Sequence, residues 1–92
     1  MKFLSTWSIK DGSLEAAVQR FLAGEAESTP GLTILGRWHK ADGSGGFTLS
    51  ETDDPAALYA FVVKWVDVLE VHSSVVIEDA AAGPILAGAF KK

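Results

Sequence analysis

Cysteine is absent from this 92-residue chain, and basic residues are few. Without cysteine the chain has no disulfide framework, no thiolate nucleophile and no cysteine-ligated zinc or iron–sulfur site. Eight Lys and Arg residues stand against twelve Asp and Glu residues, which gives a net charge of −4. Because phosphate backbones and anionic lipids attract basic surfaces, we expect neither nucleic acid nor a membrane among the partners.

Long uninterrupted apolar runs are also missing. Residues 1–12 are interrupted by Ser5, Thr6 and Ser8, so they lack the continuous apolar segment of a signal peptide. The longest weakly polar run, residues 80–90, covers about half a membrane span and is broken at Gly83 and Pro84. The sequence therefore predicts a cytoplasmic protein.

The residues that are present are typical of a single small globular domain over residues 1–92. The chain is 48% hydrophobic and 22% charged, which excludes a disordered chain. A chain of this size buries only about 60–65% of the surface that its unfolded form exposes. Its stability margin should therefore be small, and a partner would increase it.

The first part of the chain predicts a strand, a helix and a second strand. In Lys2–Ile9, apolar residues occur on both parities, as in a strand with both faces partly covered. After a turn at residues 11–13, apolar residues recur at the spacing of one helix face. They are Leu14, Ala17, Val18, Phe21 and Leu22. Residues 24–31 then indicate a loop, and residues 32–40 return to an extended pattern.

The second part predicts a hairpin, a second helix and a last strand. Asp42 and Gly43 are typical of a hairpin turn, and a strand follows over residues 47–51. Asp54 and Pro55 favour the start of a helix, whose apolar stripe continues to Leu69. Residues 71–79 predict the fourth strand, and residues 83–92 a final turn or strand.

This order of elements, β-α-β-β-α-β, predicts an α+β fold of the ferredoxin-like class. Its four-stranded antiparallel sheet carries both helices on one face. The other face is bare, and it carries Leu4, Leu35, Phe47, Leu49 and Val76. Because such an apolar patch is large for a monomer, we expect a homodimer in which two sheets pack face to face. A bulge near Gly36 or Gly46 would exchange the residues of the two faces.

Three segments carry a resemblance to a known family: TWSI near the start, GRWHKADGSGGF across the hairpin, and ETDDPAALYAFVVKW into the second helix. With them the chain resembles the short bacterial proteins of the family called domain of unknown function 3303. That family is similar to the dimeric α/β-barrel proteins, which implies two sheets packed around a central cavity. The resemblance implies no catalytic residue.

The most suggestive cluster for binding is Arg37, Trp38 and His39 on the second strand. A cation, an indole donor and an imidazole can together hold an anionic or aromatic ligand. The alternative is structural: Arg37 pairs with an acid such as Glu51, and Trp38 packs under a helix. Both interpretations remain open from the sequence.

Trp7, His72 and Glu78 join Arg37 and His39 as candidate ligand-binding residues. His72 and Glu78 share a parity, but six residues of strand separate them by about 20 Å, too far for one acid–base pair. Because no HxH or HExxH spacing is present, we predict neither a metal site nor a cofactor.

Two functions follow from these observations. In the first, a homodimer binds a small anionic or aromatic molecule in a cavity between its two sheets. It either only binds or is an enzyme of the cofactor-free monooxygenase or isomerase kind, which is an analogy with the fold alone. In the second, the chain is a noncatalytic structural or interaction module with a fully packed interface. The sequence assigns no catalytic residue to either.

Overall fold

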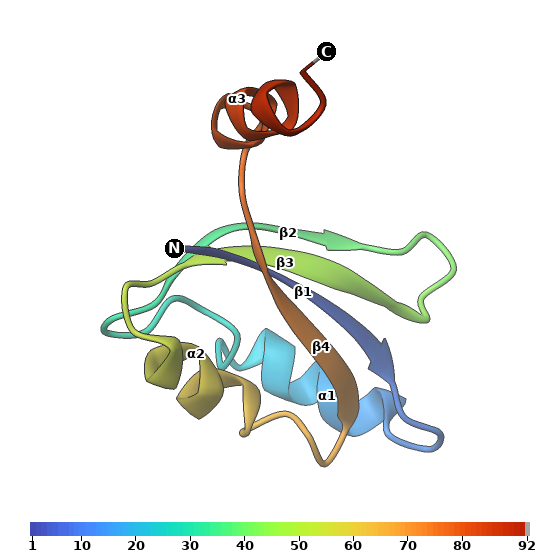
Figure 1. Ribbon diagram of the computed structural model, residues 1–92. Coiled ribbons are helices and arrows are strands. Elements are labelled where there is room, and N and C mark those ends of the chain that lie inside the picture. The colour runs from blue at the N-terminus through green and yellow to red at the C-terminus, as the bar shows by residue number, and fades with distance from the viewer. Residues whose placement is uncertain (92) are drawn as a thin grey trace.

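The computed structural model describes residues 1–91 and contains one sheet with two helices on one side (Figure 1). The strands are β1 (Lys2–Ile9), β2 (Thr33–His39), β3 (Gly45–Glu51) and β4 (Leu69–Val76). The helices are α1 (Leu14–Leu22), α2 (Pro55–Val62) and α3 (Asp79–Ala89). The strand order is β2-β3-β1-β4, and all neighbours are antiparallel. The predicted four-stranded antiparallel α+β arrangement is confirmed, with α3 added after the last strand.

Local sequence signals determine where helix α2 begins, and packing determines where it ends. The carboxylate of Asp54 accepts a hydrogen bond from the backbone N–H of Ala56 at 3.0 Å, and Pro55 follows at the first helical position. The helix then ends at Val62, so the prediction that it extends to Leu69 is wrong. Turns over residues 63–68 bury Trp65 and Val68, and this packing ends the helix earlier than the apolar period indicates.

A register shift in β2 decides which side chains each face of the sheet carries. β2 pairs with β3 at Ile34 and again from Gly36, so Leu35 is the extra residue of a bulge. Of the two positions at which a bulge would exchange the faces, the one near Gly36 has it. As a result Arg37 and His39 lie beneath the helices, and Trp38 lies on the opposite side.

We name the two faces by what lies over them. The covered face lies beneath α1 and α2 and carries Phe3, Ser5, Trp7, Ile34, Arg37, His39, Thr48, Ser50 and Val71. The open face carries Leu4, Leu35, Trp38, Phe47, Leu49 and Val76. The five apolar residues predicted for the bare face are thus found on it.

The core between the covered face and the helices is small. One cluster contains Ala17, Ala26, Trp65 and Val68, and the other contains Phe3, Leu32 and Leu58. Helix α1 contributes only Ala17 as a buried residue, although its predicted apolar stripe has five members. Leu14 and Leu22 are 55% and 76% exposed, so α1 covers the sheet loosely.

Helix α3 stands clear of the rest of the chain, on the other side of the sheet from α1 and α2 (Figure 1). None of its residues is buried. The prediction of a turn or strand in this segment is wrong for residues 83–89, which continue a helix through Gly83 and Pro84, and residue 92 lies outside the described residues. No helix within residues 1–91 is long and apolar enough to cross a membrane.

Candidate functional site

A pocket of about 140 Å³ lies between the covered face and the two helices above it. The loose seating of α1 creates this space, because its Val18 and Phe21 line the pocket and only Ala17 is buried in the core. Most of the lining is apolar and comes from both layers. It includes Ile34, Val71, Val18, Phe21, Leu58 and Phe61.

A row of polar side chains crosses the floor of the pocket. Thr48 pairs with Ser5 on one side and with Arg37 on the other, and Ser5 pairs with Ser73. These four residues, which we call the polar row, span all four strands. Ser5 and Thr48 are buried, and the Oγ atoms of Ser5 and Ser73 lie 2.7 Å apart. Because a sheet face beneath helices is normally apolar, polar groups at its centre need a specific reason.

Ser50 lies beside the polar row on β3 and lines the same pocket. It is 2% exposed, and its Oγ has no hydrogen-bond partner among residues 1–91. Leaving a buried hydroxyl unpaired costs about 1–3 kcal/mol. Such a hydroxyl calls for an explanation, and a bound molecule that supplies the missing partner is one.

Arg37 brings a positive charge into the pocket. Its guanidinium donates a hydrogen bond to the backbone carbonyl of Ala26, in the loop after α1. No carboxylate in the described chain forms an ion pair with it. Burial lowers the pKa of Arg37 from its usual value, and the charge of Glu27 opposes this shift. Since arginine stays protonated in proteins, the pocket contains a partly desolvated cation with donors left for an anion.

Aromatic rings surround Arg37 and His39 at one end of the pocket. The guanidinium of Arg37 lies 5.6 Å from the centre of the Phe21 ring. The His39 ring lies 5.3 Å from the rings of both Trp7 and Phe21, in edge-to-face geometry. Gly46 pairs with both Trp7 and His39, and a Cβ atom there would lie 2.7 Å from the Trp7 indole. Glycine at this position therefore leaves the space that the indole occupies.

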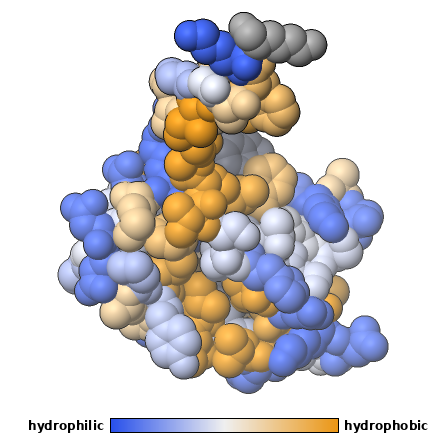
Figure 2. All heavy atoms as spheres, viewed as in Figure 1, coloured by the Kyte–Doolittle hydropathy of each residue, from blue (hydrophilic) through white to orange (hydrophobic). Residues whose placement is uncertain are grey.

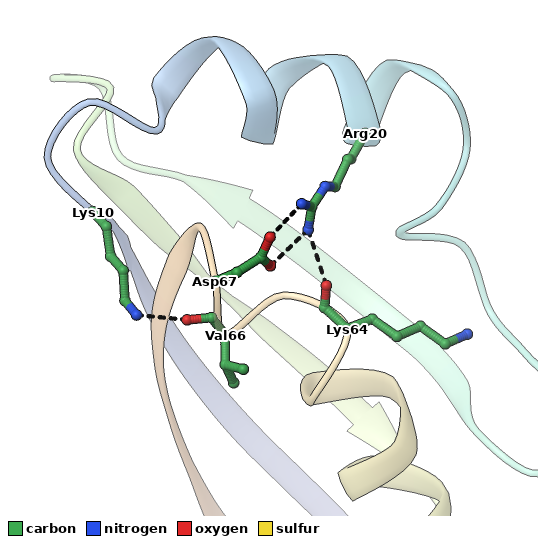
Figure 3. Close-up of polar contacts among 5 residues, drawn as sticks. All are labelled: Lys10, Arg20, Lys64, Val66 and Asp67. Atoms are coloured by element: carbon green, nitrogen blue, oxygen red, sulfur yellow. Dashed lines mark hydrogen bonds and ion pairs between the residues drawn. The ribbon is translucent and has the colours of Figure 1, made fainter.

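An ion pair outside the pocket holds α1 in place (Figure 3). The guanidinium of Arg20 donates to both carboxylate oxygens of Asp67, at 2.8 and 2.5 Å, and to the carbonyl of Lys64 at 3.0 Å. Hydrogen bonding to Arg20 lowers the pKa of Asp67 to about 2. Lys10 donates to the carbonyl of Val66 at 2.6 Å. These contacts tie α1 and the β1–α1 turn to the segment that joins α2 to β4.

The structure brings together three of the five predicted ligand-binding residues. Trp7, Arg37 and His39 all line the pocket. They lie inside one chain, and not on the sheet face where two copies would meet. For Arg37 and His39 the reason is the bulge at Leu35, which exchanges the faces of the second half of β2. Trp7 shares the parity of Phe3 and Ser5 on β1 and so lies on the covered face. Their role in binding stays a prediction, but its location is corrected.

The other two predicted residues lie outside the pocket. His72 is exposed, pairs with Thr6 in the sheet and has its Nε2 3.1 Å from a carboxylate oxygen of Glu70. Glu78 lies at the base of α3 and forms an ion pair with Lys2, which lowers the pKa of Glu78. The structure therefore does not bring His72 or Glu78 to the other candidates.

The structural roles that the sequence offered as an alternative for Arg37 and Trp38 are not found either. Arg37 contacts the carbonyl of Ala26 and does not pair with Glu51. Trp38 does not pack under a helix but stacks on Phe47 on the open face, with ring centres 5.1 Å apart. The two residues are neighbours in sequence and lie on opposite faces.

The hydroxyl groups of the floor were missed from the sequence. In β3, Thr48 and Ser50 alternate with Phe47 and Leu49, and this pattern normally indicates that the apolar residues face the helices. The opposite holds here. The signal that could have found them is the alternation itself, because Phe47 and Leu49 on the bare face place Thr48 and Ser50 on the other face.

The fold and the pocket together define a small α+β protein with a mostly apolar internal pocket. Within residues 1–91, no group of three or more His, Asp or Glu side chains could hold a metal ion. A family model described as "Domain of unknown function (DUF3303)" matches residues 1–90. The chain belongs to this family. No curated protein and no solved structure matches the chain.

Proposed function

We propose that the protein binds a small anionic molecule with a compact apolar body in the pocket beneath α1 and α2. The observation that carries this proposal is the buried, unpaired Oγ of Ser50 on the floor of a pocket that also contains Arg37. An anion would accept hydrogen bonds from the guanidinium, which has no carboxylate partner in the described chain. A second acceptor on the ligand would satisfy Ser50.

The volume of the pocket limits the apolar body of the ligand. At about 140 Å³, the pocket is close in size to an engineered apolar cavity of ~150 Å³ that binds benzene. A single ring would contact Val18, Phe21 and Phe61, with its charged group at Arg37. Benzoate is the simplest molecule of this class.

We also propose a homodimer in which a second copy covers the open face. Trp38 and Phe47 stack there and are 50% and 40% exposed. Burial of this surface against another chain would remove an unfavourable contact with water. Because the pocket lies inside each chain, a fully packed dimer interface leaves it intact. The pocket proposed here is therefore a different space from the cavity between two sheets expected from the sequence, and it can coexist with a fully packed interface.

Calorimetric titration with benzoate tests the ligand proposal. Benzamide, a neutral molecule of similar shape, should bind at least about 10-fold more weakly, because a charge-assisted hydrogen bond contributes ~1.5–3 kcal/mol. For the same reason Arg37→Gln should weaken benzoate binding by about 10- to 100-fold and leave benzamide binding nearly unchanged. Lys64→Gln is the matched control, since it removes one exposed positive charge whose ammonium points away from Arg20 and Asp67 (Figure 3).

Two results would contradict this proposal. If Arg37→Gln and the wild type bind benzoate equally well, Arg37 is not the anion contact. If neither benzoate nor benzamide produces heat or shifts the amide resonances of pocket residues at millimolar concentration, the pocket does not take a ligand of this class.

A further inference from the structure

Helix α3 is apolar on all sides after Asp79, and the rest of residues 1–91 buries none of its residues. Residues 80–90 contain no charged side chain, and Ile85, Leu86 and Phe90 are 65%, 56% and 77% exposed. Isolated helices shorter than about 12–15 residues are marginal, and an interior proline costs ~3 kcal/mol. Because α3 has 11 residues and contains Pro84, it needs packing against another surface to be stable.

The apolar surface of α3 continues onto the connection that joins it to β4. Figure 2 shows a hydrophobic band that descends from α3 into the body of the molecule. The exposed apolar residues of this region are Ile77, Ile85 and Leu86. The helix and the connection that precedes it therefore present one surface.

The chain exposes more surface than a monomer of its size should. Its accessible surface is 6310 Å², whereas a 9.8 kDa monomer is expected to expose about 5200 Å². The excess of about 1100 Å² is more than the ~800 Å² that each partner buries in a standard stable interface. The radius of gyration agrees, at 15.7 Å against about 12 Å for a compact domain of this length.

We propose that α3 is an exchanged arm, and that in the homodimer each α3 packs on the open face of the partner chain. This proposal rests on the homodimer proposed above and names the contact that holds it together. The open face offers Leu35, Trp38 and Phe47, which are 45%, 50% and 40% exposed. Two-fold symmetry makes the exchange reciprocal, so a single type of contact covers both unpartnered surfaces of each chain.

The connection to β4 explains why the arm reaches outward. Only Ile77 and Glu78 separate the end of β4 from the first residue of α3. The ion pair between Lys2 and Glu78 holds this connection beside the start of β1. The chain leaves β4 away from its own sheet (Figure 1), so α3 does not fold back over its own open face.

Light scattering on a sizing column tests the arm. The wild type should have twice the chain mass at micromolar concentration, and Leu86→Asp/Phe90→Asp should raise the dimer dissociation constant at least about 100-fold. In the double variant the sheet, α1 and α2 should persist by circular dichroism, because no residue of α3 is buried, and the loss of helical signal should not exceed the 11 residues of α3. Leu22→Asp is the control: Leu22 is also exposed, at 76%, but lies on α1, and this variant should remain dimeric.

Cysteine cross-linking locates the arm, because the chain has no cysteine of its own. Chains with Leu86→Cys are mixed with chains that carry Phe47→Cys or Trp38→Cys on the open face. We expect a disulfide that joins the two kinds of chain in at least one mixture, since it forms only when the Cα atoms come within about 7 Å. Leu22→Cys chains should form no disulfide with either sheet variant.

The outcomes separate the proposals. A monomeric wild type up to high micromolar concentration would overturn both the homodimer and the arm, and would leave the ligand proposal to its own titration. A dimer that Leu86→Asp/Phe90→Asp does not weaken would overturn the arm alone. Disulfides between two Leu86→Cys chains, with none to a sheet cysteine, would place α3 against α3 and would also overturn the arm.

Discussion

The covered and open faces of the sheet distribute polarity in the reverse of the usual way. The covered face carries hydroxyls and Arg37 at its centre, whereas the open face carries Trp38, Phe47 and leucines. In an antiparallel sheet with one wet side, apolar residues normally face the helices. Such a reversal lowers the stability of an isolated chain. The two proposals explain it, because a ligand would pair with the polar groups of the covered face and a partner would bury the apolar groups of the open face. Substitutions on the covered side test this comparison.

The largest effect is expected at Gly46, where the covered face is most crowded. A Cβ atom there would lie 2.1 Å from the carbonyl oxygen of Trp38 and 2.7 Å from the Trp7 ring. Gly46→Ala should therefore lower the free energy of unfolding by about 3 kcal/mol, measured by urea denaturation. Gly12→Ala is the control, because Gly12 has φ +79 and open space around it, so only backbone strain of about 1–2 kcal/mol applies. Equal effects of the two variants would mean that the Trp7 site is not tightly packed.

Ser50→Ala should have a smaller effect of the opposite sign. Removing an unpaired buried hydroxyl should raise the free energy of unfolding by about 1 kcal/mol in the absence of ligand, and should weaken benzoate binding. Ser5→Ala is the matched control, because the Ser5 hydroxyl is 2.7 Å from that of Ser73 and its loss leaves a partner unpaired. It should lower stability by about 1 kcal/mol. Destabilisation by both variants would mean that the covered face is arranged for stability alone.

Asp67→Asn should have the smallest effect, and one that disappears in acid. The pKa of Asp67 is lowered to about 2 in the folded chain, against ~3.9 when unfolded. Because the folded value is the lower one, the ion pair with Arg20 stabilises fully above about pH 4 and is lost as the pH falls toward about 2. Acid unfolding curves of the wild type and Asp67→Asn should thus differ at neutral pH and converge near pH ~2. A difference that persists there would show that the carboxylate acts through packing.

The positions of the strands were predictable because alternation and turn signals are local and do not depend on which face the helices cover. The alternation in residues 2–9 corresponds to the observed β1, and the predicted turn at Asp42 and Gly43 contains Gly43 with φ +77. The end of α2 was not predictable, since burial of Trp65 in the following turns overrides an apolar period that continues past Val62. Helix α3 was missed because Gly83 and Pro84 indicate a break, although the structure continues through both.

The residue types of the candidate site were predictable from the sequence, but the face of the sheet on which they lie was not. Arg37, His39 and Trp7 were recognised as a cation and rings suited to an anionic or aromatic molecule, and the pocket contains all three. Their face depends on one extra residue, Leu35, and no pattern in the sequence shows at which residue the register shifts. Ser50 was not recognised, because a serine in an alternating strand is usually exposed.

The three tryptophans lie in three different surroundings. Trp7 lines the pocket, Trp65 is in the core at 6% exposure, and Trp38 is on the open face at 50%. Indole emission shifts to shorter wavelength as the surroundings of the ring lose water. The emission of each tryptophan would therefore report a different event. Chains that keep a single tryptophan would separate ligand entry at Trp7, unfolding at Trp65 and association at Trp38 without any attached dye.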